Sequence, residues 1–190
     1  MLTRENRELL FGATKGMDEA VSASCLTKQE VDSVLLAAAE KSSEGGGLHG
    51  QKKNNSLVRR CRVVWVPSDN IRDVYQKVFA AIDLINSKHW NIKFDSLNTA
   101  QFTEYGIFGH YSAHIDLGGK DIRNRKLSAS VNLSDRGDYV GGKLWTWKGN
   151  PSDRLGAITV FPSYLLHKVT PVWWGKRRSL VFWATGEPFS

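Results

Sequence analysis

The stretch YGIFGHYSAHID, residues 105–116, decides how this chain is interpreted. It ends in His114 and Asp116, which we expect on one strand, where residues two apart share a face. His167 follows later in the chain, and Arg177 comes ten residues after it. Two imidazoles and one carboxylate can bind one face of an iron ion, which is the ligand set of non-haem Fe(II) oxygenases. The arginine adds a forked cation suited to a dicarboxylate cosubstrate.

Each of these residues has an ordinary structural alternative. His167 can be a core or surface histidine, and Asp116 can be a turn residue before Leu117-Gly-Gly119. Together, these alternatives leave the position of Arg177 unexplained. Zinc competes with iron for such ligands, but the chain has no HExxH motif and no cysteine pair of zinc-binding spacing. The pattern therefore favours iron.

Composition is that of an ordinary globular protein. The 190 residues, 41% hydrophobic and 24% charged, are assigned to one domain, residues 1–190. The net charge of +7 comes from basic clusters such as Arg59-Arg60, which we interpret mainly as solvated surface. No apolar run approaches the roughly 20 residues of a membrane span, and no secretory signal is apparent. With only Cys25 and Cys61, we expect no disulfide framework and a cytoplasmic location.

The first half of the chain, residues 1–89, is predicted to be mainly helical support plus a first strand. Thr27 and Glu30 have the spacing of a capping box before an amphipathic helix over 27–41. A strand over 62–66 and a second helix beginning at Ser68 or Asp69 follow. We expect both helices to back a sheet. A Gly-rich loop is predicted over 42–56.

The second half, residues 90–185, consists of short apolar runs separated by turn residues, which indicates an α+β, mainly β protein with a sandwich or jelly-roll core. Strands are predicted near 90–94, 98–103, 111–116, 127–133, 143–147, 157–161, 167–170 and 178–184. The loop over 117–126, like that over 42–56, is expected to border the mouth of the site.

Three collinear segments resemble the Fe(II)/2-oxoglutarate dioxygenases, specifically the prolyl 4-hydroxylase-like branch with its PKHD-type hydroxylases. The segments are Tyr105 to Asp116, Val131-Asn-Leu-Ser-Asp135 with Asp138-Tyr-Val-Gly-Gly142-Lys-Leu144, and Phe161 to Trp183. The resemblance implies a double-stranded β-helix over residues 90–185, backed by the N-terminal helices.

The resemblance also implies a role for each site residue. His114, Asp116 and His167 would bind Fe(II) as the catalytic centre, and Arg177 would hold the distal carboxylate of 2-oxoglutarate. Tyr105 matches a family tyrosine that contacts this cosubstrate, and Ser179 is a weaker candidate for the same carboxylate. The implied cofactors are Fe(II), 2-oxoglutarate, O2 and, as a supporting reductant, L-ascorbate.

The same resemblance narrows the reaction. Halogenating relatives replace the carboxylate ligand with a small residue, so Asp116 favours hydroxylation. Collagen-type prolyl hydroxylases have lysine where this chain has Arg177, which disfavours a collagen-like substrate. The expected reaction is hydroxylation of an unactivated C–H bond, with succinate and CO2 released.

The substrate class stays open among several interpretations. Family analogy favours a peptide or protein side chain, such as proline. The basic charge permits a nucleic acid, but Arg177-Arg-Ser-Leu-Val-Phe-Trp183 lacks the Arg-x-Asn-x-Thr-x-Arg pattern of the nucleic-acid demethylases. A small metabolite is a further alternative. A non-catalytic binding module on the same fold is less favoured, because it has no need of the complete ligand set.

Overall fold

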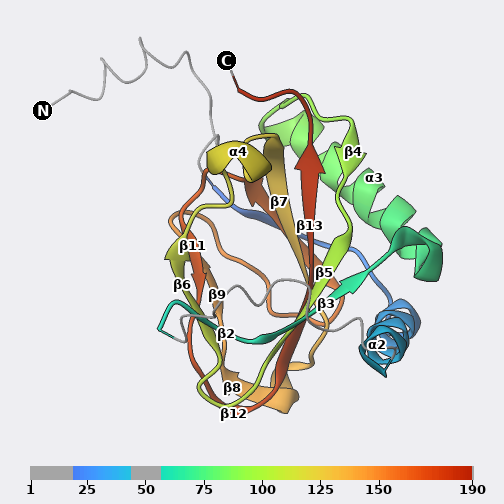
Figure 1. Cartoon of the computed structure of the whole chain (residues 1–190), viewed down its shortest axis with the longest axis vertical. Coiled ribbons are helices and arrows are strands. Elements are labelled where there is room, and N and C mark those ends of the chain that lie inside the picture. Colours follow the sequence, from blue (N-terminus) through green and yellow to red (C-terminus); the bar gives the residue numbers. More distant parts are fainter. Residues whose placement is uncertain (1–18, 44–56, 190) are drawn as a thin grey trace, which may run out of the picture.

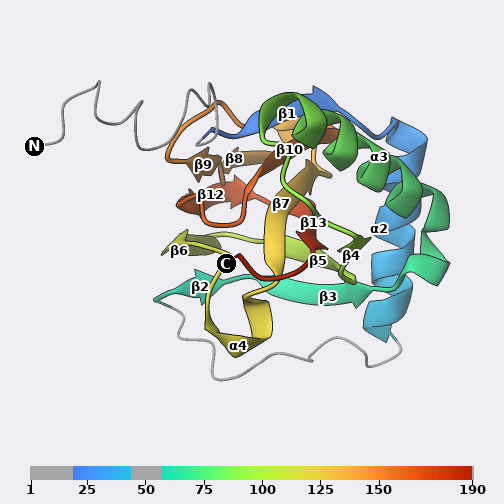
Figure 2. The same cartoon turned by 90° about the horizontal axis from the view of Figure 1, so that it is seen from above.

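Two long helices cover one face of a large antiparallel sheet in this computed structural model, which describes residues 19–43 and 57–189 (Figures 1 and 2). They are α2, Lys28–Ser43, and α3, Arg72–His89. The predicted capping box is present before α2, because the Thr27 N–H donates to Glu30 Oε2 at 2.7 Å. The short helical turns are η1, Ser68–Asn70; α4, Gly119–Ile122; and η2, Arg136–Asp138.

The major sheet has seven strands in the order β1-β10-β7-β13-β5-β3, with β4 paired to β13. The strands are β1 (Val21–Ser24), β3 (Arg62–Val66), β4 (Ser96–Leu97), β5 (Ala100–Tyr105), β7 (Arg125–Asn132), β10 (Ala157–Pro162) and β13 (Arg177–Thr185). Alternate side chains of these strands point toward α2 and α3 and form the main hydrophobic core, for example Val64, Val131 and Phe182. The other face of the sheet is left for the site.

The minor sheet faces the major sheet and has four strands in the order β2-β6-β11-β9. Its strands are β2 (Arg59–Arg60), β6 (His110–His114), β9 (Leu144–Thr146) and β11 (His167–Val169). A separate pair, β8 (Tyr139–Gly141) and β12 (Val172–Gly175), closes one end of the molecule (Figure 1). Two antiparallel sheets face to face confirm the predicted mainly β architecture backed by helices.

One predicted strand is wrong. Residues 90–94 are irregular, although three of their five side chains are apolar. The Asn86 side chain accepts from the Ile92 N–H at 2.9 Å and donates to the Ile92 carbonyl at 2.8 Å, so one side chain replaces the ladder bonds of a strand. Trp90 is instead buried directly at the end of α3.

The remaining predictions differ from the structure in smaller ways. The helices over 27–41 and beyond Ser68 and the strand over 62–66 are confirmed, as are the other seven strands of the second half. The strands β1, β2, β4, β8 and β12 were not predicted, because each has only two to four residues and pairs with a partner distant in sequence. Of the predicted loop over 42–56, residues 44–56 lie outside the described residues.

Candidate metal centre and active-site cavity

The three predicted metal ligands converge because two short strands pair in register. His114 ends β6 and lies directly opposite His167, the first residue of β11. Asp116 follows His114 by two residues, and its N–H donates to the Ser163 carbonyl at 2.8 Å. Its Oδ1 lies 3.6 Å from His114 Nε2, and its Oδ2 lies 3.5 Å from His167 Nε2. One ligand atom from each residue lies within 4.8 Å of the others, which is a suitable spacing for one ion.

Hydrogen bonds orient each ligand. His114 Nδ1 lies 2.8 Å from the Ser112 carbonyl, and His167 Nδ1 lies 2.8 Å from the Leu165 carbonyl. A carbonyl partner requires the proton on Nδ1, which leaves the Nε2 lone pair of each neutral ring available to a metal. The Asp116 carboxylate accepts from Ser128 Oγ at 2.7 Å and Trp183 Nε1 at 2.9 Å, both at Oδ2. Each of the three side chains is therefore held in position by at least one hydrogen bond to a neighbouring residue.

Electrostatics favours the protonation states that a metal needs. Burial alone would raise the pKa of Asp116, but bonding to His114, the charge of His167 and the Trp183 and Ser128 donors lower it overall. Burial lowers the pKa of His167, partly opposed by the Asp116 charge. An ionised carboxylate is the form of Asp116 that binds a cation.

A cavity of about 180 Å³ opens between the two sheets beside these ligands. Its wall includes all six residues singled out from the sequence: Tyr105, His114, Asp116, His167, Arg177 and Ser179. The structure therefore brings together residues that are spread over 75 positions of the chain, from 105 to 179 inclusive.

Arg177 is 4% exposed and anchors one wall of this cavity. Its Nη1 donates to Ser179 Oγ at 3.3 Å, and its Cζ lies 5.7 Å from the centroid of the Tyr105 ring. Burial raises the pKa of Tyr105 to about 12, opposed in part by the charges of Arg59 and Arg177. A protonated phenol and a guanidinium thus stand on the same wall, where both can donate to an anion.

The Gly-Gly pair quoted from the sequence shapes the approach to Arg177. Gly142 has a φ of +57°, and its N–H donates to the Pro171 carbonyl at 2.9 Å. A Cβ on Gly142 would lie 3.2 Å from Arg177 Cδ and 2.8 Å from a Val172 methyl group. Glycine is required here both for the backbone conformation and for the close packing on the arginine stem.

Among the other residues of the cavity wall, Arg59, Tyr111, Arg125 and Trp183 were given no role in the site by sequence reasoning. The Tyr111 ring stacks on His114 with centroids 3.6 Å apart. Arg59 was grouped with the solvated basic clusters, but it faces inward from β2 because it pairs with Tyr111. Arg125 lies at the end of the predicted 117–126 loop, which supports the expectation that this loop borders the site.

The donor set passes the chemical test for non-haem iron. Two imidazole nitrogens and one carboxylate converge on one side of a cavity, and an arginine lies on its wall. Such a set occupies one face of an Fe(II) ion and leaves the other face to the cavity. The described residues contain no cysteine within this group, so sulfur ligation plays no part.

Residues 100–185 match the profile of the family described as the 2OG-Fe(II) oxygenase superfamily. This segment belongs to that superfamily. The chain is also similar to a PKHD-type hydroxylase from Stutzerimonas stutzeri, with 34% identity over 43% of the chain and 41% of that protein. A PKHD-type hydroxylase from Prochlorococcus marinus is 28% identical over 83% of the chain and 71% of its own length. The chain therefore matches about two fifths of the length of the Stutzerimonas stutzeri protein and 71% of the length of the Prochlorococcus marinus protein.

Solved structures confirm the double-stranded β-helix of this oxygenase core. A Pseudomonas putida prolyl-4-hydroxylase superposes with a TM-score of 0.70 at 19% identity, covering 98% of this chain and all of that one. A Trichoplax adhaerens prolyl hydroxylase, in complex with a hypoxia inducible factor peptide fragment, gives 0.67 at 18% identity over 94% and 86%. At these identities the likeness establishes the fold.

Two further expectations can be compared with the structure. None of the described helices is long and apolar enough to cross a membrane. Cys25 and Cys61 are both free thiols, as expected for a chain without a disulfide framework.

Proposed function

We propose that this protein is an Fe(II)- and 2-oxoglutarate-dependent dioxygenase that hydroxylates an unactivated C–H bond. The observation that carries the proposal is the convergence of His114, Asp116 and His167 on a cavity whose wall contains the buried Arg177. If the three residues had only a structural role, they would need no open cavity beside them. A purely structural site would also need no buried arginine on the cavity wall. A metal with a dicarboxylate cosubstrate accounts for both features.

Each residue then has a defined task. His114, Asp116 and His167 hold Fe(II), while Ser128 and Trp183 keep the carboxylate oriented. When bound, the metal supplies O2 activation coupled to oxidative decarboxylation of 2-oxoglutarate. In the balanced reaction, 2-oxoglutarate, O2 and R–H give succinate, CO2 and R–OH.

The cosubstrate carboxylate remote from the metal is assigned to Arg177. The guanidinium is positioned by its bond to Ser179 Oγ, and Ser179 is itself 2.7 Å from Thr103 Oγ1, so the wall is a connected polar network. The high pKa of Tyr105 keeps its phenol protonated, so it donates rather than accepts near an anion. Burial of this network excludes water and strengthens each charged contact.

For the substrate, we propose a peptide or protein side chain, with proline as the leading residue. Support comes from the names of the proteins with similar structures, which are prolyl hydroxylases. One of them was solved in complex with a peptide fragment. We further propose one domain over residues 1–190, a cytoplasmic location, and L-ascorbate as the reductant that maintains Fe(II). A nucleic acid as substrate is not favoured by the Arg177 to Trp183 segment.

The proposal is tested by adding Fe(II) and then 2-oxoglutarate to metal-free protein without oxygen and recording the visible spectrum. We expect a metal-to-ligand charge-transfer band that is absent in His114→Ala. If direct metal analysis finds no iron bound to the wild-type protein, the oxygenase assignment is wrong and a binding module on the same fold replaces it. A gain of 16 Da in pools of peptides, amino acids or oligonucleotides then identifies the substrate class.

A further inference from the structure

The cavity contains more positive charge than the proposed cosubstrate needs. Three arginines line it, Arg59, Arg125 and Arg177, and Asp116 is the only acidic residue among the described residues of its wall. A divalent ion and a 2-oxoglutarate dianion cancel each other. Once Asp116 is balanced by one guanidinium, two guanidinium charges remain without an anion. Because unpaired charge is costly in a partly desolvated cavity, this surplus requires an explanation.

Arg59 is fixed in place by neutral groups. Its Nη2 donates to Gln101 Oε1 at 2.7 Å, and its Nε donates to Cys61 Sγ at 3.0 Å. The guanidinium lies over the face of Tyr111, with Cζ 4.7 Å from the ring centroid. These contacts orient the cation but do not neutralise it.

Arg125 approaches the metal ligands from the other sheet. Its Cζ lies 3.8 Å above the Trp183 ring, the same indole that donates to Asp116. Its Nε is buried and has no hydrogen-bond partner. A buried guanidinium N–H without an acceptor is uncommon, since such groups are normally paired. The Arg125 side chain also lines the cavity, so its guanidinium borders the space in which a ligand would bind.

The two surplus arginines act on one place. Both line the same cavity as Tyr111, and the Arg59 guanidinium lies over the Tyr111 ring. Tyr111 in turn stacks on the metal ligand His114. Anything bound by this group, which we call the Arg59–Tyr111–Arg125 subsite, therefore lies next to the metal centre.

Cations on the outside of the same sheet are treated differently. Arg62, Arg178 and Lys176 all surround the carboxylate of Glu104, with Arg178 Nε at 2.8 Å from Glu104 Oε2. These three cations therefore share one acidic partner. Arg59 and Arg125 have no carboxylate beside them on the described cavity wall other than that of the metal ligand Asp116.

Resting on the oxygenase function proposed above, we infer that the substrate carries a carboxylate close to the carbon that is hydroxylated, and that the Arg59–Tyr111–Arg125 subsite binds it. A planar carboxylate matches the fork of a guanidinium and is smaller than a tetrahedral phosphate. Size matters because about 180 Å³ must also accommodate 2-oxoglutarate. The carboxylate can belong to a free amino acid or to an acidic residue or C-terminus of a peptide.

The test uses matched acid and amide ligands on the anaerobic protein loaded with Fe(II) and 2-oxoglutarate. Calorimetry compares free L-amino acids with their amides, and peptides containing Asp or Glu with the same peptides containing Asn or Gln. We expect at least one acid to bind about 10- to 100-fold more tightly than its amide, the range of a charge-assisted hydrogen bond. In air, the same acid should increase succinate formation and gain 16 Da. The two arms separate a free acid from a peptide as its source.

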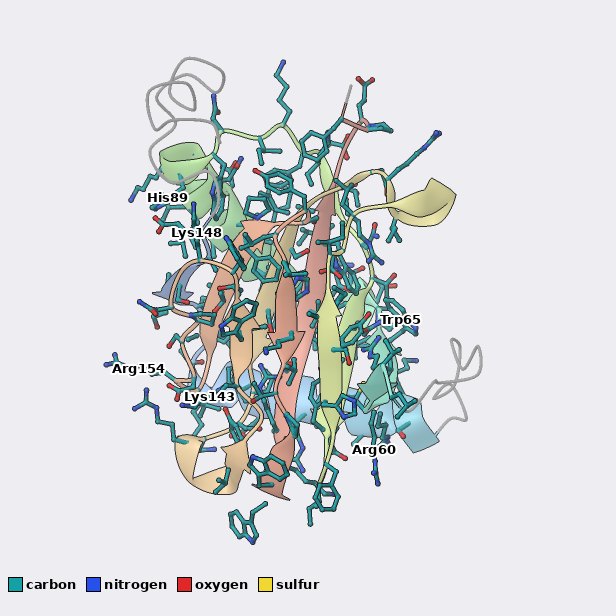
Figure 3. All side chains as sticks on the ribbon, turned by 90° about the vertical axis from the view of Figure 1, so that its left-hand side faces the viewer. Arg60, Trp65, His89, Lys143, Lys148 and Arg154 are labelled. Atoms are coloured by element: carbon teal, nitrogen blue, oxygen red, sulfur yellow. The ribbon has the colours of Figure 1, made fainter. Side chains whose placement is uncertain are left out.

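Variants connect the preference to the subsite. Arg59→Gln and Arg125→Gln should each abolish most of the preference for the acid, whereas Arg59→Lys and Arg125→Lys should retain part of it because the charge stays. The matched control is Arg60→Gln, which neighbours Arg59 on β2 but is exposed and points outward (Figure 3). It should bind the acid as the wild-type protein does. Thermal unfolding confirms that each variant is folded.

The outcomes are distinguishable from failure of the oxygenase proposal. If no charge-transfer band forms in the wild-type protein, the function itself is wrong. If the band forms but amides, phosphopeptides or oligonucleotides bind as well as the acids, or no acid binds, the carboxylate inference is overturned. It is also overturned if Arg59→Gln and Arg125→Gln weaken 2-oxoglutarate binding instead, because these arginines would then serve the cosubstrate.

Discussion

The two sheets that enclose the cavity differ in length and burial, and they divide the work of the site. β13 of the major sheet runs for nine residues, and it supplies Arg177, Ser179 and Trp183 from a single buried strand. β6 and β11 of the minor sheet have five and three residues and carry the two histidines. The minor sheet carries the two histidine ligands. The major sheet carries the side chains that orient the Asp116 carboxylate and the arginine on the cavity wall.

Asp116 connects the two sheets. Its chain position follows β6, but its carboxylate accepts hydrogen bonds from Ser128 on β7 and Trp183 on β13. Such a division predicts that substitutions in the minor sheet remove function with little loss of stability. Substitutions toward the helices on the major sheet should do the reverse, because that face is the hydrophobic core.

The largest effect is expected for His167→Ala in the minor sheet. Loss of one of three ligands should remove iron binding and all 2-oxoglutarate turnover, while the free energy of unfolding changes by about 1 kcal/mol or less. Succinate formation and urea denaturation measure the two quantities. His110→Ala is the control, since this histidine is on β6 but bonds only to backbone carbonyls of Phe108 and Leu57. Iron-dependent turnover by His167→Ala would contradict the ligand assignment.

Phe182→Ala tests the other side of the comparison. Phe182 is fully buried on the helix-facing side of β13 and meets Tyr75 edge-to-face with centroids 5.0 Å apart. We expect a loss of about 3–5 kcal/mol in unfolding free energy, from lost burial and the cavity left behind. Leu36→Ala on the exposed side of α2 should change it by about 0.5 kcal/mol or less. Equal losses in the two variants would contradict this position of the core.

Arg177→Ala should affect the cosubstrate alone. We expect the 2-oxoglutarate requirement to rise about 10- to 100-fold, with a smaller rise for Arg177→Lys, which keeps the charge but not the fork. Arg178→Ala is the control from the same strand, because Arg178 points to Glu104 and not into the cavity. Titration of the anaerobic charge-transfer band measures the affinity. An unchanged requirement in Arg177→Ala would transfer the cosubstrate to Arg59 or Arg125.

The sequence predicted the site better than it predicted the rest of the cavity. His114 and Asp116 were predicted from the two-residue period of a strand, although β6 ends at His114 and Asp116 is held beyond it by the bond from its N–H to the Ser163 carbonyl. The distal His167 and Arg177 belong to a spaced pattern that is visible in the local sequence. Arg59 faces inward only because β2 pairs with β6 in one register, in which its partner is Tyr111, 52 positions away. The Arg-Arg dipeptide gives no signal as to which of its members is buried.

The errors in the fold have equally specific causes. Residues 90–94 contain the apolar side chains of a strand, but the backbone is satisfied by the Asn86 side chain, and nothing in the local pattern indicates that contact. β1 is recognisable only through its pairing with β10. Val21 lies opposite Val160 and Ser24 lies opposite Ala157, so the paired residues are 133 to 139 positions apart. Contacts of this range are determined by tertiary structure and not by periodicity.

Trp183→Phe tests whether the major sheet tunes the metal. The phenyl ring keeps the packing but removes the 2.9 Å bond from Nε1 to Asp116 Oδ2. We expect about a 10-fold loss of metal affinity, at the lower end for partners that orient a ligand. Competition with a coloured chelator measures it. The control is Trp173→Phe, since Trp173 is exposed on β12, and this variant should leave the metal affinity unchanged. If wild type and Trp183→Phe bind the metal equally well, Ser128 alone orients the Asp116 carboxylate.

The smallest effect concerns the helices behind the major sheet. The hydrogen bond from Lys77, followed by those from Thr27, lowers the pKa of Glu30 from its ordinary 4.5 to about 2. Since the folded-state pKa is the lower one, the stabilisation is complete above about pH 4.5 and disappears as the pH falls toward 2. Glu30→Gln should therefore cost about 1 kcal/mol or less near pH 7, and the difference from wild type should shrink below pH 4.5. Urea denaturation at a series of pH values measures it. Lys77→Met removes the main cause of the low pKa of Glu30, so it should flatten the pH dependence of stability. If the difference in stability between wild type and Glu30→Gln stays constant down to pH 2, Glu30 acts by packing and not by charge.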